Sequence, residues 1–530
     1  MGKLLAASSR DEYGSALREK QRIIFKISDY LNQAGFTPIK TPLIERQSTF
    51  ESYPAKNMFQ LYDQQGDNLV LRPDMTLPVA RFIESHCREE VPKQLYYIDD
   101  VVRKTPYLSG QYNQISQAGI EIIGDENLSA EEKGLAIMLA IAQKFDLNDL
   151  QIVLGDASLI KAVLANFPDL TARQQEAIQA AIEEKNISKF KRLTAHLQGL
   201  PTILQDWPLA FGKTADEVAE ALAAFPNLKG ITAKWQKLTA FVQTNYPDIK
   251  VMVDLAVQAP QPYYTGPIIQ GFLPILGENL FSGGRYDQLL KNYQEEFYPA
   301  VGLGMNLERL LVARKKVATQ PDPVVVVLAK GRVEEDVRGL LKAAGVDTSP
   351  LENPGRKLIF ESSDKRFHFI LVKPSDVLKY LDRGIGDIGV VGSDTIAEQE
   401  QNHYDVLDLQ RGKAEFVLAA PAGFQLDGNQ RHRIATKYPK TASQYFNRRG
   451  QDVELIKLEG SVELGPLTGL ADAIVDISQT GDTLRANKLK VYEELVPVST
   501  HLLVRRGALF QHQTELTKLI ENLMKELKEG

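Results

Sequence analysis

A short polar seam divides the 530-residue chain into two segments with different hydrophobic patterns. The seam, residues 314–323, reads RKKVATQPDP and contains two prolines. It is followed at once by VVVVLA, an apolar run typical of a buried strand. A chain of this length is also too long for a single hydrophobic core. The sequence therefore predicts two domains, residues 1–316 and 324–530, joined by a linker at residues 317–323.

The first segment has strand-like runs before a long helical stretch. Residues 14–35 carry apolar residues at helical spacing and end at Gly35, a plausible helix C-cap. Strand-like runs follow, and residues 126–248 then show helical periodicity. Strands that precede a helical insert are typical of an α+β domain.

The second segment alternates between strand and helix patterns. Residues 324–329 read as a strand, 334–344 as a helix, and FHFILV as the next strand. The same alternation continues through DIGVVG, EFVLAAP, VELIKL and ADAIVDI. Strands separated by helices of this length favour βαβ units and a parallel sheet, so this segment is predicted to be an α/β domain.

Composition excludes several classes of protein. The net charge of −6 disfavours a nucleic-acid-binding domain, because neutralising phosphates requires an excess of Lys and Arg. The single cysteine, Cys87, excludes an intramolecular disulfide and suits a reducing compartment. No stretch has the apolar length of a signal peptide or membrane span. The seven histidines lack HxH or HExxH spacing, so no protein metal site is expected. We therefore expect a soluble cytoplasmic protein without nucleic-acid or membrane partners.

The stretch GLADAIVDISQTGDTLRAN, residues 469–487, has the pattern of a phosphate site. An apolar strand ends near Asp476, a short loop carries Gly481, and Thr483 opens a helix. Unpaired N–H groups at the start of a helix can bind a phosphate monoester, and Asp476 could accept hydrogen bonds from ribose hydroxyls. An ordinary strand–turn–helix with a threonine cap would give the same pattern, so these residues alone leave both interpretations open.

Longer motifs extend this pattern over nearly the whole second segment, which resembles the catalytic subunit of the short-form ATP phosphoribosyltransferases. The resemblance implies a two-lobed α/β fold of the periplasmic-binding-protein type (type II). It also implies the first step of histidine biosynthesis, in which N1 of ATP attacks the anomeric carbon of phosphoribosyl pyrophosphate and pyrophosphate leaves. The motifs are LAKGR (328–332), GRKLIF (355–360), GIGDIGVVGSDT (384–395), RIATKYP (433–439) and IKLEGSVELGPLTGLADAIVDISQTGDTL (456–484).

The same resemblance implies roles for individual residues. Arg332 and Arg356 match catalytic positions that face the leaving pyrophosphate, where a guanidinium can bind two oxygens at once. Mg²⁺ is expected as a cofactor held mainly by the substrate pyrophosphate. This chain departs from the family at Gln479, where an acid is usual, and at Ala329, where Pro or Ser is usual. The implied substrate-binding residues are Lys330, Asp394, Glu463, Asp476, Gln479, Thr480, Gly481, Asp482 and Thr483.

The first segment resembles the catalytic core of histidyl-tRNA synthetase and, more closely, the regulatory subunit of short-form ATP phosphoribosyltransferase. The resemblance implies a class II aminoacyl-tRNA-synthetase fold, an antiparallel sheet flanked by helices, and a homo-oligomer, either a dimer or a tetramer of the fused chain. The motifs are TPLIE (41–45), LRPDMT (71–76), VVRK (101–104), QAGIEIIG (117–124), PYYTG (262–266), SGGRYDQL (282–289) and AVGLGMNLERL (300–310).

The synthetase reaction is not expected, although its amino-acid pocket is largely kept. Ala259 and its neighbours replace the Arg-Gly-Leu-Asp of the synthetase, and the loop KTPYLSGQYNQ lacks the arginines that hold ATP. Arg309 remains, but no anticodon-binding domain follows the first segment. The retained residues predict a pocket for histidine, which would act as a feedback inhibitor. They are Asp74, Thr76, Arg103, Gln117, Glu121, Tyr263 and Tyr264.

Three classes of function are compatible with parts of this sequence: a fused, feedback-regulated transferase, a tRNA ligase and a solute-binding protein. The ligase would need the missing arginine and a tRNA-binding domain. The solute-binding protein would need an export signal and would not need the phosphate loop. A catalytically silent histidine-binding or synthetase-like protein is the alternative to an active transferase.

Overall fold

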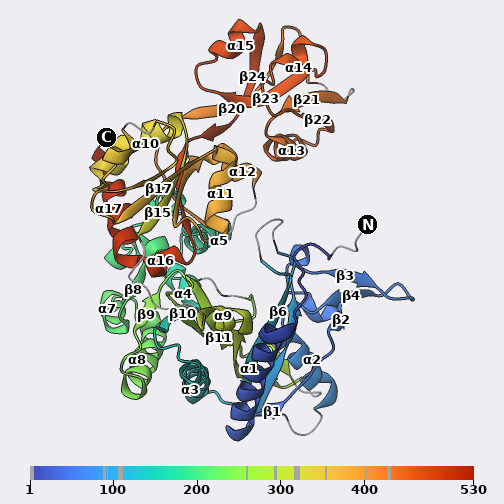
Figure 1. Ribbon diagram of the computed structural model, residues 1–530, viewed down its shortest axis with the longest axis vertical. Coiled ribbons are helices and arrows are strands. Elements are labelled where there is room, and N and C mark those ends of the chain that lie inside the picture. The colour runs from blue at the N-terminus through green and yellow to red at the C-terminus, as the bar shows by residue number, and fades with distance from the viewer. Residues whose placement is uncertain are drawn as a thin grey trace. The chain divides into compact units, whose positions relative to one another are not determined.

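The chain forms two compact units, Met1–Gln320 and Pro321–Gly530 (Figure 1). The computed structural model describes residues 5–87, 91, 93–105, 111–257, 259, 261–291, 295–315, 323–352, 355–399, 403–426 and 431–529. Over these residues no helix combines the length and the apolar character that crossing a membrane requires.

A nine-stranded sheet organises the first unit, in the order β1-β5-β6-β14-β11-β10-β7-β9-β8. The neighbouring strands from β5 to β7 are antiparallel, as the class II resemblance implies. Only β1 with β5 and β7 with β9 are parallel. The strands are β1 (Thr37–Pro38), β5 (Gln94–Val102), β6 (Gln114–Ile123), β7 (Gln151–Asp156), β8 (Phe211–Lys213), β9 (Val251–Asp254), β10 (Pro267–Leu273), β11 (Glu278–Arg285) and β14 (Ala300–Asn306).

Helices cover this sheet, and the first of them confirms the sequence prediction. Helix α1 (Gly14–Gln33) buries Ile23, Ile27 and Leu31 on one face, and Gly35 follows its end with φ +84°. The other helices are α2 (Thr76–His86), α3 (Ser129–Lys144), α4 (Leu159–Leu164), α5 (Ala172–Glu183), α6 (Ile187–Thr194), α7 (Ala215–Ala221), α8 (Lys229–Asn245) and α9 (Leu307–Ala313). Two small sheets complete the unit, β2 (Ile44–Arg46) with β4 (Asn68–Leu71) and β3 (Gln60–Tyr62), and β12 (Leu290–Lys291) with β13 (Phe297–Tyr298).

The stretch predicted to be helical, residues 126–248, is not helical throughout. It contains strand β7, which pairs with β10 inside the main sheet, and the short strand β8 at its edge. Five of the six residues of β7 are buried, so its sequence QIVLGD has no polar alternation to mark it as a strand. A short buried strand and a turn of buried helix are indistinguishable by periodicity alone.

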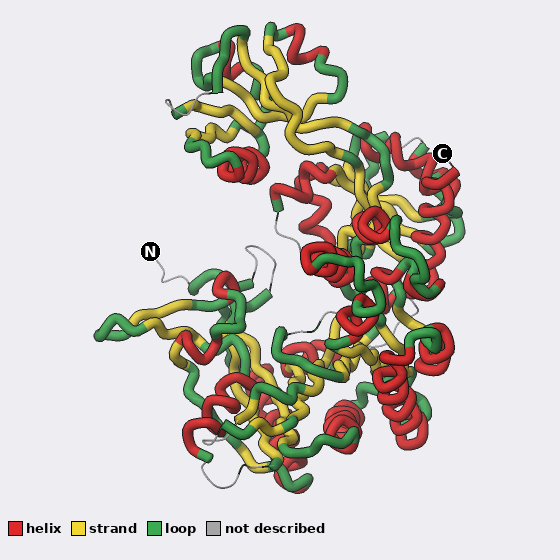
Figure 2. Tube along the Cα trace, turned by 180° about the vertical axis from the view of Figure 1, so that it is seen from behind, coloured by secondary structure: helices red, strands yellow, loops and turns green. Residues whose placement is uncertain are grey.

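The second unit consists of two lobes, each with its own sheet and apolar core. The first-lobe sheet runs β16-β17-β15-β18-β25-β19, and the second-lobe sheet runs β22-β21-β23-β20-β24. The chain passes to the second lobe between β19 and β20 and returns between β24 and β25. Figure 2 shows helices lying around the strands of each sheet. This arrangement agrees with the two-lobed α/β fold that the resemblance implies.

The strands of the first lobe are β15 (Val324–Ala329), β16 (Ile359–Glu361), β17 (Phe367–Val372), β18 (Ile388–Gly392), β19 (His403–Asp408) and β25 (Thr500–Arg505). Its helices are α10 (Arg332–Ala343), α11 (Pro374–Asp382), α12 (Ser393–Glu398), α16 (Ala508–Gln511) and α17 (Gln513–Glu529). The second lobe has strands β20 (Ala414–Pro421), β21 (His432–Thr436), β22 (Val453–Lys457), β23 (Ala473–Ser478) and β24 (Leu489–Val498), and helices α13 (Pro439–Arg448), α14 (Leu464–Leu467) and α15 (Asp482–Ala486).

Both sheets of the second unit are mixed, where the alternating pattern predicts parallel ones. Strand β15 is parallel to β17 and β18, and β21 is parallel to β22 and β23. The strands that carry the chain between lobes are antiparallel: β25 to β18, and β20 to β23 and β24. The crossings explain these pairings, because a strand that enters or leaves a lobe need not follow the βαβ path. Strand β16 is antiparallel to β17 for another reason, since a short turn joins the two as a hairpin.

A buried ion pair holds the helical part of the first unit to its sheet. Lys185, just after α5, places its Nζ 3.1 Å from both carboxylate oxygens of Asp254, the last residue of β9. The Lys185 and Asp254 side chains are only 2% and 4% exposed. Removing one partner of such a pair leaves an uncompensated buried charge.

We expect Lys185→Met to lower the free energy of unfolding by roughly 3–5 kcal/mol, the scale for breaking a buried pair. Lys189→Met is the matched control, because Lys189 pairs with the exposed Glu184 and should change stability by less than about 1 kcal/mol. Urea unfolding followed by tryptophan fluorescence reports this region directly, since Trp207 and Trp235 are buried there. Equal effects of the two substitutions would contradict a stabilising role for the pair.

Candidate functional site

A cavity of about 440 Å³ in the first unit is lined by most of the residues that are predicted to bind the ligand histidine. The motif LRPDMT supplies side chains at the start of α2, strand β6 supplies Gln117, and the turn before β10 supplies two tyrosines. The structure thus brings together residues that lie up to 190 positions apart in the chain, as in the hydrogen bond from Tyr263 to Asp74, which spans 189 positions. The predicted residues that line the cavity are Asp74, Thr76, Arg103, Gln117, Tyr263 and Tyr264.

Glu121, the remaining predicted residue, lies behind this lining. Its side chain is fully buried, and its Oε1 accepts a 2.8 Å hydrogen bond from the Thr76 hydroxyl. The Tyr286 hydroxyl donates a hydrogen bond to Oε2. In the ladder, Glu121 lies opposite Gly302 of β14, where a Cβ atom would collide with the Glu121 carboxylate. The glycine is therefore required to leave room for the buried acid.

Burial dominates the electrostatics at this inner end of the cavity. Burial, with a smaller contribution from the nearby Asp74 carboxylate, outweighs the hydrogen bonds from Tyr286 and Thr76 and raises the pKa of Glu121 to about 8. Burial also raises the pKa of Asp74, although the Leu77 N–H donates to its Oδ1 at 3.0 Å. Two acids held in this way suit a ligand that brings positive charge or N–H donors.

Two arginines line the cavity, and neighbouring groups engage both of them. Arg309 donates to the Asn279 carbonyl at 2.6 Å and pairs with the Glu278 carboxylate at 2.5 Å. Arg103 donates from Nε to the Pro73 carbonyl at 2.7 Å. Gln261 lines the cavity in the segment where the synthetase has its arginine. Residues 106–110 of the loop KTPYLSGQYNQ, and Pro260, lie outside the described residues.

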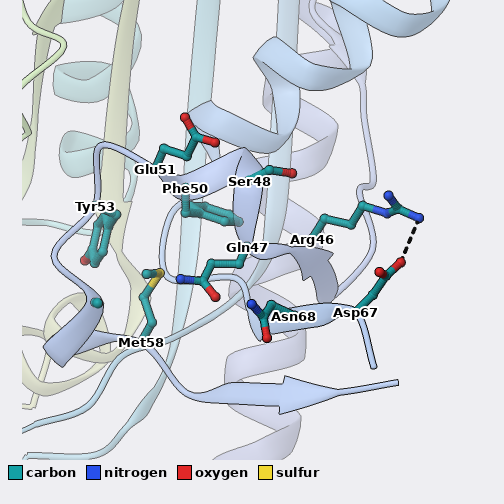
Figure 3. Close-up of a pocket in the computed structure, with 10 residues that line it drawn as sticks. Arg46, Gln47, Ser48, Phe50, Glu51, Tyr53, Met58, Asp67 and Asn68 are labelled. Atoms are coloured by element: carbon teal, nitrogen blue, oxygen red, sulfur yellow. Dashed lines mark ion pairs between the residues drawn. The ribbon is translucent and has the colours of Figure 1, made fainter. Parts of the chain in front are cut away.

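A second cavity of about 380 Å³ lies next to the first and shares Tyr53 with it. Figure 3 shows Phe50, Tyr53 and Met58 on one side of this cavity and the Arg46–Asp67 ion pair, at 3.2 Å, on the other. Phe50 and Met58 are buried, whereas the ion pair is exposed. None of the residues predicted to bind a ligand lines this second cavity.

Three predicted acids of the second unit meet where its two lobes join. Asp394, the second residue of helix α12 in the first lobe, accepts a 3.1 Å hydrogen bond from the Tyr438 hydroxyl of the second lobe. Asp476 lies near the end of β23, and burial raises its pKa to about 6. The carboxylates of Glu463 and Asp394 also raise the pKa of Asp476, while Lys437 lowers it. These acids therefore influence one another electrostatically across the junction of the lobes.

The predicted phosphate loop has the expected strand–loop–helix form. Gly481 has φ +72°, in the left-handed region, and α15 begins at the next residue. The Thr480 hydroxyl donates to the Asp482 carboxylate at 2.6 Å, and Arg485 pairs with the same carboxylate at 2.5 Å. The exposed predicted residues around this turn are Gln479, Thr480, Asp482 and Thr483.

The predicted cations lie on the first lobe. Lys330 follows strand β15 and is exposed, and Arg356 is exposed in the turn before β16. Arg332 is the first residue of α10, and its side chain lies outside the described part of the structure. The described residues thus do not show these three cations converging on one point.

Sequence reasoning missed three residues that the structure places at these sites. Tyr286 donates a hydrogen bond to Glu121 behind the first cavity, Tyr438 contacts Asp394, and Glu398 bonds to the start of α13. Tyr286 and Tyr438 stand within the quoted motifs SGGRYDQL and RIATKYP. Their place in these motifs could have marked both tyrosines as candidate site residues. Their partners are distant in the sequence, so the contacts themselves could not be predicted from it.

Comparison with known proteins gives two family matches along the chain. The model for histidyl-tRNA synthetase matches residues 10–310, and the model for ATP phosphoribosyltransferase matches residues 373–529. The chain is 55% identical over 202 residues to an ATP phosphoribosyltransferase of Lacticaseibacillus casei, which covers 38% of this chain and 95% of the relative. It is 39% identical over 314 residues to an ATP phosphoribosyltransferase regulatory subunit of Lactiplantibacillus plantarum, which covers 58% of this chain and 81% of the relative.

A solved structure supports the fold. A protein from Bacillus halodurans, described as an ATP phosphoribosyltransferase regulatory subunit/histidyl-tRNA synthetase, aligns with a TM-score of 0.52 at 24% identity. The alignment covers 70% of this chain and 98% of that protein.

The fold and the matches define a pentosyltransferase preceded by a class II synthetase-like domain. The chain belongs to the ATP phosphoribosyltransferase family, as an enzyme of histidine biosynthesis in which a part like the regulatory subunit is fused to the catalytic part.

The raised pKa of Glu121 predicts a specific dependence of stability on pH. Between pH 4.5 and about 8 the folded chain keeps a proton that the unfolded chain loses, so stability falls as the pH rises through this window and levels off above it. Relative to Glu121→Gln, which cannot titrate, the wild-type free energy of unfolding should fall by up to about 1.4 kcal/mol per pH unit. Thermal or urea unfolding of both proteins from pH 5 to 9 measures the difference, and parallel curves would contradict the shift.

Proposed function

We propose that the second unit binds ATP and phosphoribosyl pyrophosphate between its lobes and joins N1 of ATP to the anomeric carbon. The bond from that carbon to the pyrophosphate oxygen breaks, and pyrophosphate leaves with the electron pair. The observation that carries the proposal is the phosphate loop at 478–482 directly after Asp476, in a lobe whose Tyr438 reaches Asp394 of the other lobe. The loop would hold the 5′-phosphate and Asp476 the ribose hydroxyls.

The proposed roles of the individual residues follow from the charges that develop during the reaction. The leaving pyrophosphate gains negative charge as the ribosyl carbon becomes cationic, so Arg332, Arg356 and Lys330 would stabilise the leaving group. Asp394 and Glu463 would lie near the nucleotide. Asp476, with a pKa of about 6, is mostly ionised at neutral pH and can accept hydrogen bonds from ribose hydroxyls. The other substrate contacts would come from the loop residues Gln479, Thr480, Gly481, Asp482 and Thr483.

Among the described residues, no group of three His, Cys, Asp or Glu side chains could hold a metal ion. We propose that Mg²⁺ is bound mainly by the pyrophosphate oxygens of phosphoribosyl pyrophosphate, where it would neutralise charge on the leaving group.

The direct test is turnover by the purified full chain with ATP, phosphoribosyl pyrophosphate and Mg²⁺. Phosphoribosyl-ATP should form, with an equal amount of pyrophosphate released and no comparable reaction with other nucleotides. A folded sample that forms no product with both substrates would disprove the proposal.

If Arg332 and Arg356 neutralise the leaving group, Arg332→Ala and Arg356→Ala should each lower kcat by roughly 10²–10³-fold, the scale for losing one preorganised donor. Arg356→Lys should be milder, because it keeps the charge and loses only the two-pronged contact. Arg366→Ala is the matched control, since Arg366 is exposed in the same lobe and pairs locally with Asp364. Steady-state kinetics separate the cases: a change confined to KM would mean that the arginines serve binding alone.

We further propose that histidine binds the 440 Å³ cavity of the first unit and inhibits the transferase. Asp74 and Gln117, which line the cavity, would bind the polar groups of histidine, and Glu121 would act from behind them through the Thr76 hydroxyl. The Tyr263 and Tyr264 rings pack against each other, with centroids 5.0 Å apart, and would form one wall of the binding pocket. Because coupling between binding sites is reciprocal, substrates should weaken histidine binding by the factor by which histidine weakens theirs.

The domain limits and the assembly are also proposals. We assign residues 1–316 to the regulatory domain, 317–323 to the linker and 324–530 to the catalytic domain. The fused chain is proposed to form a homo-oligomer, a dimer or tetramer, in keeping with the usual dimeric state of class II synthetase folds.

Removing the buried acid should weaken histidine binding without affecting the catalytic unit. We expect Glu121→Ala to raise the histidine concentration for half inhibition at least tenfold, with uninhibited kcat nearly unchanged. Glu121→Gln repeats the test with little change of shape, and Glu176→Ala, at an exposed position on α5, is the control. Inhibition curves at fixed substrate concentrations decide the matter. Unchanged curves for both Glu121 variants would exclude this cavity as the sensor.

A further inference from the structure

Two helices from different lobes of the second unit are joined end to end by one carboxylate. Glu398, the last residue of α12 in the first lobe, accepts hydrogen bonds from the start of α13 in the second lobe. The Lys440 N–H donates to Oε2 at 3.0 Å, and the Thr441 N–H and hydroxyl donate to Oε1 at 2.8 Å each.

These bonds replace a cap that α13 lacks. The residue before the helix, Tyr438, gives no side-chain hydrogen bond to its first turn, and Pro439 has no N–H to satisfy. The next free donors are the N–H groups of Lys440 and Thr441, and Glu398 satisfies both. A carboxylate at this end is also favoured by the partial positive charge of the helix terminus.

A second contact joins the same pair of helices. Asp394, four residues before Glu398 and so on the same face of α12, accepts the hydrogen bond from Tyr438. Tyr438 is buried, and its pKa is raised by burial and by the Asp394 carboxylate. Asp394 is a proposed substrate contact that a nucleotide would compete for, whereas Glu398 is not.

Besides these contacts, two short segments of the chain join the lobes. The lobes have separate apolar cores, and the chain crosses between them at residues 409–413 and at Ser499. The Ser393 N–H, at the start of α12, donates to the Ser499 carbonyl at 2.8 Å, so this end of α12 is tied to a crossing. Glu398 lies at the opposite end of α12, about one and a half turns away. Its bonds therefore restrain rotation about the crossings.

We propose that Glu398 is a positioning residue that fixes the orientation of the two lobes. By capping α13 across the junction, it holds the phosphate loop and Asp476 of the second lobe in place relative to Asp394 of the first lobe. This inference rests on the proposed binding of the substrates between the lobes. It does not depend on the roles assigned to Arg332 and Arg356.

The kinetic test uses Glu398→Ala in the full chain. Misplacement of bound groups by about 1 Å can cost on the order of 10²-fold in rate, so kcat should fall 10- to 100-fold. The thermal midpoint should change by no more than a few degrees, because each lobe keeps its core. Glu398→Gln keeps one acceptor oxygen and should recover part of the rate. Glu521→Ala, at an exposed position on α17, is the control and should be unchanged.

A double-mutant cycle and a distance measurement separate positioning from a general loss of structure. Thr441→Val removes one donor, and it should cost little more once Glu398→Ala is present. Spin labels at Lys342→Cys and Lys490→Cys, exposed on the first and second lobes, with Cys87→Ala, should give a narrow distance distribution. Glu398→Ala should broaden this distribution.

The proposal is overturned if Glu398→Ala keeps kcat within twofold of wild type, or if the distance distribution stays as narrow as before. A wild-type chain without turnover would instead disprove the proposed function, and the distance measurement would still decide whether Glu398 holds the lobes.

Discussion

The pairing of β6 with β14 is the constraint on which the first unit depends. These neighbouring strands within the nine-stranded sheet place Glu121 opposite Gly302 and Gln117 opposite Asn306. A Cβ atom at Gly302 would collide with Glu121, and one at Gly304 would collide with Gln117. The sheet can therefore carry a buried acid and an amide at one spot only because the facing strand offers backbone without side chains. The 440 Å³ cavity lies beside these glycines, which are among its lining residues.

Buried carboxylates shape both candidate sites. Glu121 and Asp476 have pKa values raised to about 8 and about 6 by burial, and each has another acid close by. A buried acid without a cation is costly, and a ligand that brings N–H or hydroxyl donors relieves that cost. A carboxylate with a raised pKa beside a second acid would thus serve an amino-acid ligand in one unit and a ribose in the other.

The second unit depends on how its two lobes are held together, because the lobes have independent cores and the chain crosses between them twice. Its mixed sheets follow from those crossings, which run antiparallel to the βαβ core of each lobe. Contacts between α12 and α13 supply the remaining restraint, through Tyr438 with Asp394 and through Glu398 with the first turn of α13. A lobe junction that depends on a few polar contacts can respond to the charge of whatever binds there.

The sequence by itself determined the two-part organisation, the class of each domain, the helix at 14–33 and the strand–loop–helix at 473–486. Each of these rests on local periodicity, turn chemistry or motifs that are contiguous in the chain. Tertiary structure decided the rest. Strand β7 was hidden because burial on both faces removes polar alternation, and β25 pairs antiparallel only because the chain returns from the other lobe. The depth of Glu121, the pairing of Arg309 with Glu278 and the cap from Glu398 to α13 each join segments that are distant in sequence or in different elements. No local pattern encodes such contacts, since they arise only when packing brings the partners together.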